Sequence, residues 1–224
     1  MNNEVFDAAG ASPKKPGRRP GRPSGGQGAE ARAHLLDVAL ALFARQGIGE
    51  TTLGAIAREA GVTPAMVHYY FKTREQLLDM LIDERFVPLR TELASVFQHA
   101  DAEPVATLRA FVEKLAATVE RHPWFASLWI REVISEDGLL RRGMAERFGD
   151  ERKDHALKRI QAWQRDGKLN PELGPSLVFM SLFGLTVLPL ATARWRDERE
   201  RSVTTEQIAK HAVALLMHGI RPFQ

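Results

Sequence analysis

The sequence predicts an all-α fold, and three of its features support that class. Apolar residues recur three and four positions apart along most of the chain, which is the period of one face of a helix. Hydroxyl residues, glycines and prolines stand where such helices would begin and end. No stretch alternates apolar and polar residues for long enough to form a strand. We therefore expect a small N-terminal helical domain followed by a larger helical bundle.

The first 28 residues differ in composition from the rest. They hold six glycines, four prolines, five Lys or Arg residues and two acidic residues, so they account for the net charge of +3. Such a segment buries too little apolar surface to offset the entropy of ordering it. We predict that residues 1–28 form a disordered basic tail. Around Arg19 and Arg22 it is similar to an AT-hook, so it either enters a minor groove, attracts phosphates without specificity, or acts as an inert linker.

Four helices are expected in the next segment, residues 29–89. The first carries an apolar stripe from Leu35 to Phe43 and ends at Gly47. The second follows Thr52 and the third follows Thr63, since a hydroxyl accepts a hydrogen bond from the free N–H groups of a helix start. A capping box beginning at Thr73 starts the fourth, which should reach about residue 97 and be kinked or ended at Pro88.

Residues 52–71 have the pattern of a helix-turn-helix unit. Ala57 is small enough to let two helices cross closely, and Gly61 can adopt the left-handed backbone of a tight turn. An ordinary corner between two helices would show the same two residues. Five groups that suit phosphate binding or stacking then follow within seven positions, and they cannot all be core. They are His68, Tyr69, Tyr70, Lys72 and Arg74. This density favours DNA binding, with Thr52 and Thr63 placing helix starts against the backbone phosphates.

The segment also resembles a known family. The phrases A-L-A-L-F-A-R-Q-G at 39–47, T-T-L-G-A-I-A-R-E-A-G-V at 51–62 and V-H-Y-Y-F-K-T-R-E-Q-L-L at 67–78 are similar to the N-terminal domain of the tetracycline-repressor family. The resemblance implies a homodimer that binds a palindromic operator in double-stranded DNA, usually as a repressor. It also implies a C-terminal domain, here residues 90–224, that senses a small molecule. Such a regulator would be cytoplasmic.

By that resemblance the third helix directs four side chains at the bases: Pro64, Ala65, Met66 and Tyr69. His68 and Tyr70 flank them, and Lys72 and Arg74 reach phosphates. The chain departs from many members in having His68 in place of tyrosine, Met66 in place of a small polar residue and Gly54 in place of a longer side chain. The base-facing set contains no Arg, Lys, Asn or Gln, so we expect specificity to rest on thymine methyl groups and DNA shape.

Beyond residue 97 we expect helices near 104–121, 123–135, 138–166, 172–194 and 204–219. Apolar and aromatic side chains on three of them suggest a pocket for a largely apolar or planar effector. The candidates are Trp124, Trp129, Arg131, Glu132, Trp163, Phe179 and Phe183. The alternative is that the aromatic residues are plain core, and that Arg131 and Glu132 reach the surface or are tied to neighbouring helices.

Residues 173–193 carry no charge over a length that approaches a membrane span. We instead expect a helix buried on both sides, which pairs with the 204–219 helix and their symmetry mates in a dimer. The rival classes are an enzyme and an architectural DNA-binding protein without an effector, which would lack a ligand-sized cavity beside the fourth helix. The chain has no cysteine, phosphate loop, Gly-x-Ser-x-Gly or metal-ligand spacing, so we expect no enzyme, cofactor or metal.

Overall fold

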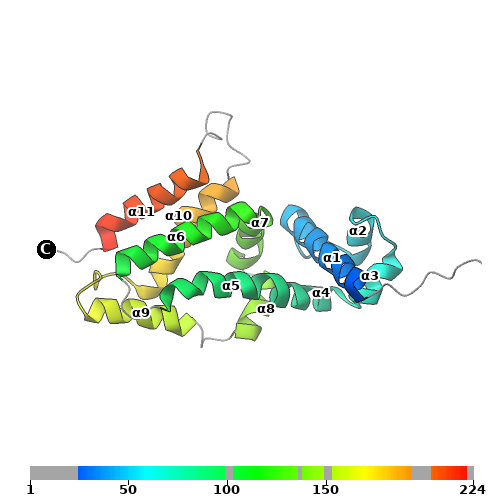
Figure 1. The fold of residues 1–224 in the computed structure, drawn as a ribbon, viewed down its shortest axis with the longest axis horizontal. Helices are drawn as coiled ribbons and strands as arrows, with labels where there is room; N and C mark the ends of the chain where they lie inside the picture. The colour runs from blue at the N-terminus through cyan, green and yellow to red at the C-terminus, as the bar shows by residue number, and fades with distance from the viewer. Residues whose placement is uncertain (1–24, 99–102, 136–137, 149–152, 193–202, 221–224) are drawn as a thin grey trace, which may run out of the picture.

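The structure is a computed structural model that describes residues 25–98, 103–135, 138–148, 153–192 and 203–220. Every regular element in these ranges is helical, which confirms the predicted all-α class. In Figure 1 the helices α1, α2 and α3 gather at one end of an elongated molecule, and the remaining helices extend away from them. We call residues 25–81 the head and the described residues from 82 onward the body.

The head contains four helices: α1 (Gly25–Gln46), α2 (Leu53–Glu59), α3 (Pro64–Tyr70) and α4 (Arg74–Leu81). The body begins with a π-helical turn, η1 (Ile82–Phe86), then α5 (Val87–Ala94), a 3₁₀ turn, η2 (Ser95–Phe97), and α6 (Pro104–Arg121). It continues with α7 (Trp124–Trp129), a second π-helical turn, η3 (Ile130–Ile134), α8 (Leu139–Phe148), α9 (Lys153–Arg165), α10 (Pro175–Thr192) and α11 (Thr205–Ile220).

The first helix begins earlier than the sequence suggested. It starts at Gly25, so residues 25–28 of the expected tail are helical, and residues 1–24 lie outside the described residues. Once a helix has nucleated, each further residue adds one backbone hydrogen bond, which allows it to extend through a glycine-rich segment. A Cβ added at Gly28 would lie 3.6 Å from the Tyr70 hydroxyl. The start of α1 therefore lies beside the end of α3.

The head has its own apolar core. Its fully buried side chains include Leu36, Leu40, Phe43, Ile56, Val67, Phe71 and Leu77. They come from all four head helices, and burying each large side chain contributes roughly 1.5–3 kcal/mol. Leu128 of α7 and Leu140 of α8 belong to the same cluster. The head is therefore packed directly onto two body helices.

A nearly continuous helix connects the head to the body. It comprises α4, η1, α5 and η2, as the sequence suggested for residues 74–97, but Pro88 does not end it. A proline cannot donate to the carbonyl four residues earlier. Here the Glu84 carbonyl instead accepts from Arg85 Nη1 at 3.4 Å, and the wider π turn immediately precedes the proline. The helix therefore continues through Pro88, which is the second residue of α5, directly after η1.

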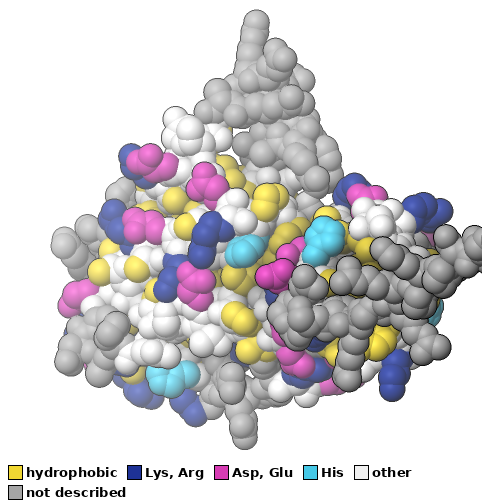
Figure 2. Space-filling model, turned by 45° about the vertical axis from the view of Figure 1, so that its right-hand side comes forward, with side chains coloured by type: hydrophobic (Ala, Val, Ile, Leu, Met, Phe, Trp, Pro, Cys, Tyr) yellow, Lys and Arg dark blue, Asp and Glu magenta, His cyan; other side chains and the backbone are white. Residues whose placement is uncertain are grey.

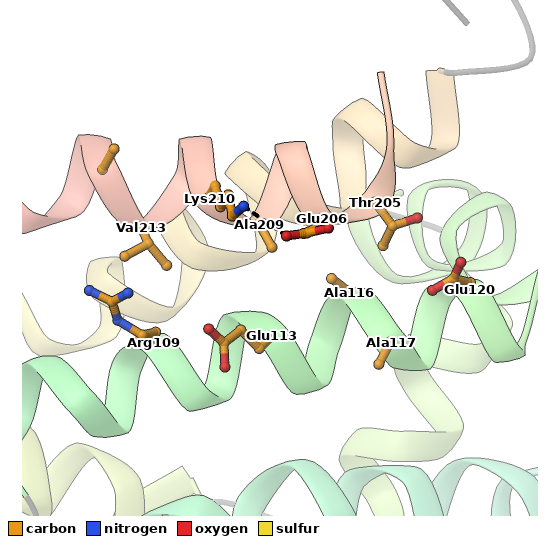
Figure 3. A pocket seen from close by; sticks show the side chains of 11 residues that line it. Arg109, Glu113, Ala116, Ala117, Glu120, Thr205, Glu206, Ala209, Lys210 and Val213 are labelled. Carbon is orange, nitrogen blue, oxygen red and sulfur yellow. Dashed lines mark ion pairs between the residues drawn. The ribbon is translucent and has the colours of Figure 1, made fainter. Parts of the chain in front are cut away.

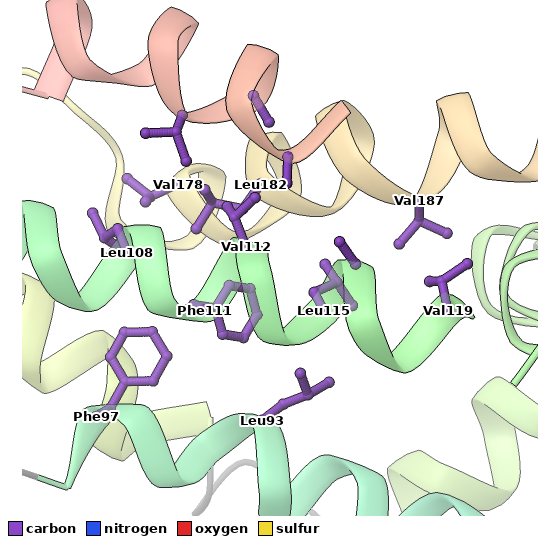
Figure 4. Packing of buried hydrophobic residues seen from close by; sticks show 14 of the residues in the cluster. Leu93, Phe97, Leu108, Phe111, Val112, Leu115, Val119, Val178, Leu182 and Val187 are labelled. Carbon is purple, nitrogen blue, oxygen red and sulfur yellow. The ribbon is translucent and has the colours of Figure 1, made fainter. Parts of the chain in front are cut away.

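The body is built around α6. Figure 4 shows Phe111, Val112 and Leu115 of α6 between α5 on one side and α10 and α11 on the other. These three side chains are at most 4% exposed. The single helix expected over 138–166 is described as two, α8 and α9, with residues 149–152 outside the described residues.

Helix α10 is covered on only one side. Val178, Leu182 and Val187 are buried in the body core. Leu177, Met180 and Leu188 are 58%, 69% and 52% exposed on the other side. Among the described helices, α10 is long and apolar enough to cross a membrane by length and composition. We expected α10 to be buried on both sides, and within a single chain only one of its two sides is buried.

Candidate nucleic-acid interface and effector site

The turn between α2 and α3 has the geometry that its sequence predicts. Gly61 has a φ of +66°, in the left-handed region that favours glycine. The Val62 N–H donates to the Ala57 carbonyl at 2.9 Å and closes the turn. Ala57 is 1% exposed, so the two helices approach closely at this point. The result is two short helices locked at a fixed angle.

Threonine side chains start both helices. The Thr52 Oγ1 accepts from the Ala55 N–H at 3.1 Å, and the Thr63 Oγ1 accepts from the Met66 N–H at 3.3 Å. Both threonines are exposed. Each hydroxyl keeps its own proton to donate, so we propose that both threonines contact backbone phosphates of DNA.

The outward face of α3 holds most of the predicted contact residues. Val67 and Phe71 point into the head core and are fully buried. The exposed residues are Pro64, Ala65, His68, Tyr69 and Lys72, with Tyr69 68% exposed, while Met66 and Tyr70 are half-buried. The Tyr69 and Tyr70 rings meet edge to face at 5.1 Å, which restrains both. One side of a short, rigid helix thus presents aromatic, imidazole and cationic groups.

Arg74 has a partner that the sequence did not reveal. Its Nη1 donates to the Gly49 carbonyl at 2.7 Å and lies 3.5 Å from the Ile48 carbonyl. It therefore joins the start of α4 to the loop between α1 and α2. This contact assigns Arg74 a part in head geometry, in addition to the phosphate contact predicted for it.

Charges of both signs are mixed on one face of the molecule. On the face in Figure 2, Lys and Arg side chains alternate with Asp and Glu rather than forming a patch of one sign. Ion pairs such as Arg45–Glu59, with 2.9 Å between Nη2 and Oε1, contribute to this mixture. Arg19 and Arg22 lie outside the described residues. The start of α1 beside Tyr70 nevertheless means that the tail is joined to the chain next to α3.

Four of the predicted effector residues lie in one aromatic cluster of the body. The Trp129 and Phe183 rings are stacked with centroids 4.6 Å apart, and Phe125 stacks on Trp129 at 5.8 Å. Phe179 is joined to Phe183 through contacts of both rings with Phe111. Trp124 contacts Phe125 and also Phe86. The cluster therefore reaches from α10 to the start of the body.

The remaining predicted effector residues are Trp163, Arg131 and Glu132. Trp163 is 3% exposed and belongs to the same hydrophobic core of the body as these rings. Arg131 and Glu132 are directed at the end of α1, where Glu132 Oε1 accepts from the Ile48 N–H at 3.1 Å. Of the alternatives considered for Arg131 and Glu132, the structure agrees with a tie to a neighbouring helix, because both side chains bond to the end of α1. Nothing in the pattern of the sequence identified the partner, which is 84 residues away.

A groove of about 460 Å³ opens elsewhere, between α6 and α11 (Figure 3). Its floor is formed by small side chains such as Ala116 and Ala209, and its rim carries charges that include the Glu206–Lys210 ion pair at 2.7 Å. None of the predicted effector residues lines it. The groove is thus polar at its edge and lies away from α4, where the ligand-sized cavity was expected. Within the described residues, no cluster of three or more potential metal ligands occurs.

A close-fitting pair of short helices with an exposed second helix, mounted on a helical body, defines a helix-turn-helix DNA-binding protein. Comparison with known proteins agrees with this class. Residues 35–81 match the profile of the bacterial regulatory proteins of the tetR family. This segment is therefore similar to the DNA-binding domain of tetR-type regulators, and the relatives that match most of the chain are helix-turn-helix transcriptional regulators.

Two relatives and one solved structure show the extent of the similarity. The transcriptional regulator RutR of Escherichia coli K12 is 28% identical over 202 residues, which cover 84% of this chain and 89% of RutR. AcrR of Shigella flexneri is 36% identical over 94 residues, 40% of this chain and 42% of AcrR. The Bacillus subtilis regulator FadR, solved with stearoyl-CoA, superposes with a TM-score of 0.64 at 18% identity, over 84% of this chain and 99% of FadR. The last likeness concerns the fold.

Proposed function

We propose that this regulator is a homodimeric repressor that binds a palindromic operator through α3 and is released by a small-molecule effector. The observation that carries the proposal is the outward face of α3, where Tyr69 is 68% exposed beside His68 and Lys72 while Val67 and Phe71 fix the helix from behind. A rigid, exposed helix of this kind fits the major groove of B-DNA. The role is regulatory rather than catalytic, and its place is the cytoplasm.

Base recognition in this proposal depends on contact and shape. Ala65, Met66 and the Tyr69 ring offer apolar surface suited to thymine methyl groups. None of the base-facing side chains has the paired donors that read guanine or the amide that reads adenine. We therefore propose operators whose central specificity comes from thymine positions and from the deformability of the duplex.

The exposed side of α10 supports the dimer. Leu177, Met180 and Leu188 form an apolar face that is unusual on the free surface of a monomer, and Leu215 of α11 is also 54% exposed. Two copies would cover these faces with a four-helix arrangement. A symmetric dimer presents two copies of α3, which is why the operator is proposed to be palindromic.

The aromatic cluster around Trp129 and Phe183 supports an apolar or planar effector. The Trp129 and Phe183 rings stack with their centroids 4.6 Å apart. A planar ligand inserted between them would stack on both rings. FadR, which shares the fold, was solved with stearoyl-CoA, whose acyl chain is apolar. A ligand at this cluster lies beside α7, which packs against α1. It can therefore bias the placement of the head.

The test of DNA recognition begins with selection of duplexes from a random pool by the wild-type protein. Lys72→Ala should weaken binding to every duplex equally and reduce the salt slope by about one unit, because it removes one phosphate contact. Tyr69→Ala should instead reduce the discrimination between selected and unselected duplexes. Arg165→Ala, at the end of α9 in the body, is the matched control. If both α3-region variants bound like this control, the assignment of α3 would be wrong.

A further inference from the structure

The loop between α1 and α2 determines where the DNA-reading unit begins. It starts at Gly47, whose φ is +93°, and ends at Thr52, the cap of α2. Thr51 is fully buried, and its Oγ1 donates to the Gly47 carbonyl at 2.7 Å. Because α2 follows this loop without a further linker, any displacement of the loop displaces α2 and α3.

Two consecutive residues of the body hold this loop. The Glu132 carboxylate accepts from the Ile48 N–H at 3.1 Å, and the two residues are 7% and 1% exposed. A carboxylate is costly to bury unless hydrogen bonds compensate for its lost hydration. On the other side, Arg131 Nη2 donates to the Arg45 carbonyl at 3.5 Å. The Cδ of Arg131 would lie 3.4 Å from a Cβ added at Gly47, so this side chain packs closely against the glycine. The end of α1 is thus held from two directions.

The same turn is connected to the aromatic cluster. Glu132 belongs to η3, which continues α7, and Trp129 is the last residue of α7. The Trp129 ring stacks on Phe183 of α10. Behind η3, a Cβ at Gly138 would lie 1.8 Å from the Glu132 carbonyl oxygen, so the backbone is closely confined there. The helical segment formed by α7 and η3 therefore contacts the cluster through Trp129 and the head loop through Glu132.

We propose that Glu132 is a positioning residue for DNA binding, which fixes the 47–52 loop through the Ile48 amide and transmits shifts of the Trp129–Phe183 stack to α2 and α3. The inference deepens the proposed function and rests on it. It assigns the coupling to a named hydrogen bond between η3 and the end of α1. A ligand that separates the stacked rings moves η3, and the carboxylate then leaves the amide.

The head retains its own fold without this bond. Arg74 holds the loop from α4 through the Gly49 carbonyl at 2.7 Å, and Gln46 Nε2 donates to Thr51 Oγ1 at 3.1 Å. These contacts lie within the head. Loss of the Glu132 carboxylate should therefore change where the loop sits relative to the body while the helix-turn-helix unit stays folded.

The experiment compares Glu132→Ala with Glu132→Gln, whose side-chain oxygen can still accept from Ile48. Glu132→Ala should accelerate hydrogen exchange at the Ile48 amide and lower affinity for wild-type-selected duplexes about tenfold, a typical size for coupling between sites. Glu132→Gln should keep both the exchange rate of the Ile48 amide and the DNA affinity within about twofold of the wild-type values. A twofold change is smaller than the loss of one ordinary hydrogen bond would cause. Val112→Ala, in the α6 core, is the control: it should lower the melting temperature and leave DNA affinity unchanged.

A double-mutant cycle tests transmission from the stack. Phe183→Leu removes the ring that stacks on Trp129, and it should lower DNA affinity in the wild-type background but not further in Glu132→Ala. Independent, additive losses would overturn the transmission. Unchanged affinity in Glu132→Ala, with wild-type binding intact, would overturn the positioning role alone. Failure of the wild-type protein to enrich any duplex would instead defeat the proposed function, and this inference with it.

Discussion

At the scale of single residues, a few charged side chains join the body to the head and its connecting helix. Arg147 of α8 donates to Asp83 of η1 at 2.7 and 2.9 Å and to Asp79 of α4 at 2.8 Å. Arg85 of η1 donates to Asp37 of α1 at 3.0 Å. These contacts are charge-assisted hydrogen bonds between helices distant in sequence, with defined geometry at the guanidinium.

The Arg147 contact predicts a specific pH dependence of stability. Its hydrogen bonds hold the pKa of Asp83 below the usual value, against the opposing effect of burial. A lowered folded-state pKa adds stability that is present above the ordinary aspartate pKa and is lost as pH falls through the lowered one. Arg147→Met should lower the melting temperature by about 1–3 °C at pH 7, since exposed pairs contribute at most about 1 kcal/mol.

That difference should shrink as the pH falls below about 4, the ordinary aspartate range, because Asp83 then becomes protonated in the wild type. Calorimetric melting of both proteins between pH 7 and pH 2 measures it. Arg165→Met in α9 serves as the control and should show little change at either pH. A difference between Arg147→Met and wild type that persisted unchanged at pH 2 would contradict the explanation.

At the scale of elements, the structure changes the interpretation of α10. Phe183 lies in the uncharged segment that was expected to be buried on both sides in a dimer, but its ring packs on Trp129 and Phe111 within the body. The exposed side instead carries Leu177, Met180 and Leu188. Leu216 of α11, the helix expected to pair with α10 in the dimer, is partly buried against the body core. The proposed interface therefore lies on a different face of α10 from Phe183.

Met180→Asp should dissociate the proposed dimer without unfolding the body. The residue is 69% exposed in the single chain, so the charge is costly only where a partner covers it. Sedimentation velocity should show a monomer with unchanged helical circular dichroism, while Ala94→Asp, at an exposed position on α5, stays dimeric. A fully dimeric Met180→Asp would exclude this face. Recovery of the wild type in the membrane fraction would indicate instead that α10 meets lipid.

At the scale of the whole molecule, the start of α1 lies beside the helix proposed to bind DNA. A Cβ added at Gly28 would lie 3.6 Å from the Tyr70 hydroxyl at the end of α3. Residues 1–28 account for the whole net charge of +3 in the sequence. The basic segment is therefore joined to the described chain close to α3.

Deletion of residues 1–24, which leaves α1 whole, removes five cations. Affinity for selected duplexes should fall and the salt dependence should become shallower, while the melting temperature stays the same. If Arg19 and Arg22 enter a minor groove, the loss is larger on A·T-rich flanks than on G·C-rich flanks. Equal losses on both flanks would support plain phosphate attraction, and an unchanged salt slope would identify an inert linker.

The coupling between effector and operator should be reciprocal. A compound found by thermal-shift screening should lower operator affinity by some factor, typically about 5–150-fold, and the operator should lower affinity for that compound by the same factor. Titrations of each ligand in the presence of the other measure both factors. A compound that binds at the aromatic cluster but leaves operator affinity unchanged would contradict release by an effector.

The sequence alone determined the helical class, the position of the helix-turn-helix segment and many helix ends. Two glycines expected at helix ends or turns, Gly47 and Gly61, both have positive φ. The threonines before α2, α3 and α4 all cap their helices. The capping box at Thr204 forms in both directions with Gln207, whereas at Thr73 the side chain of Gln76 accepts from Lys72 instead. These features depend on contacts within a few residues, which a linear pattern contains.

Only the tertiary structure decided which partners the charged and aromatic side chains take. Glu132 meets Ile48 across 84 residues, Arg147 meets Asp83 across 64, and Arg74 meets Gly49 across 25. The direction of Phe183 and the exposed side of α10 likewise follow from how α6, α7 and α11 pack around that helix. Periodicity identifies an apolar face but not the surface that covers it, because that surface is formed by distant parts of the chain.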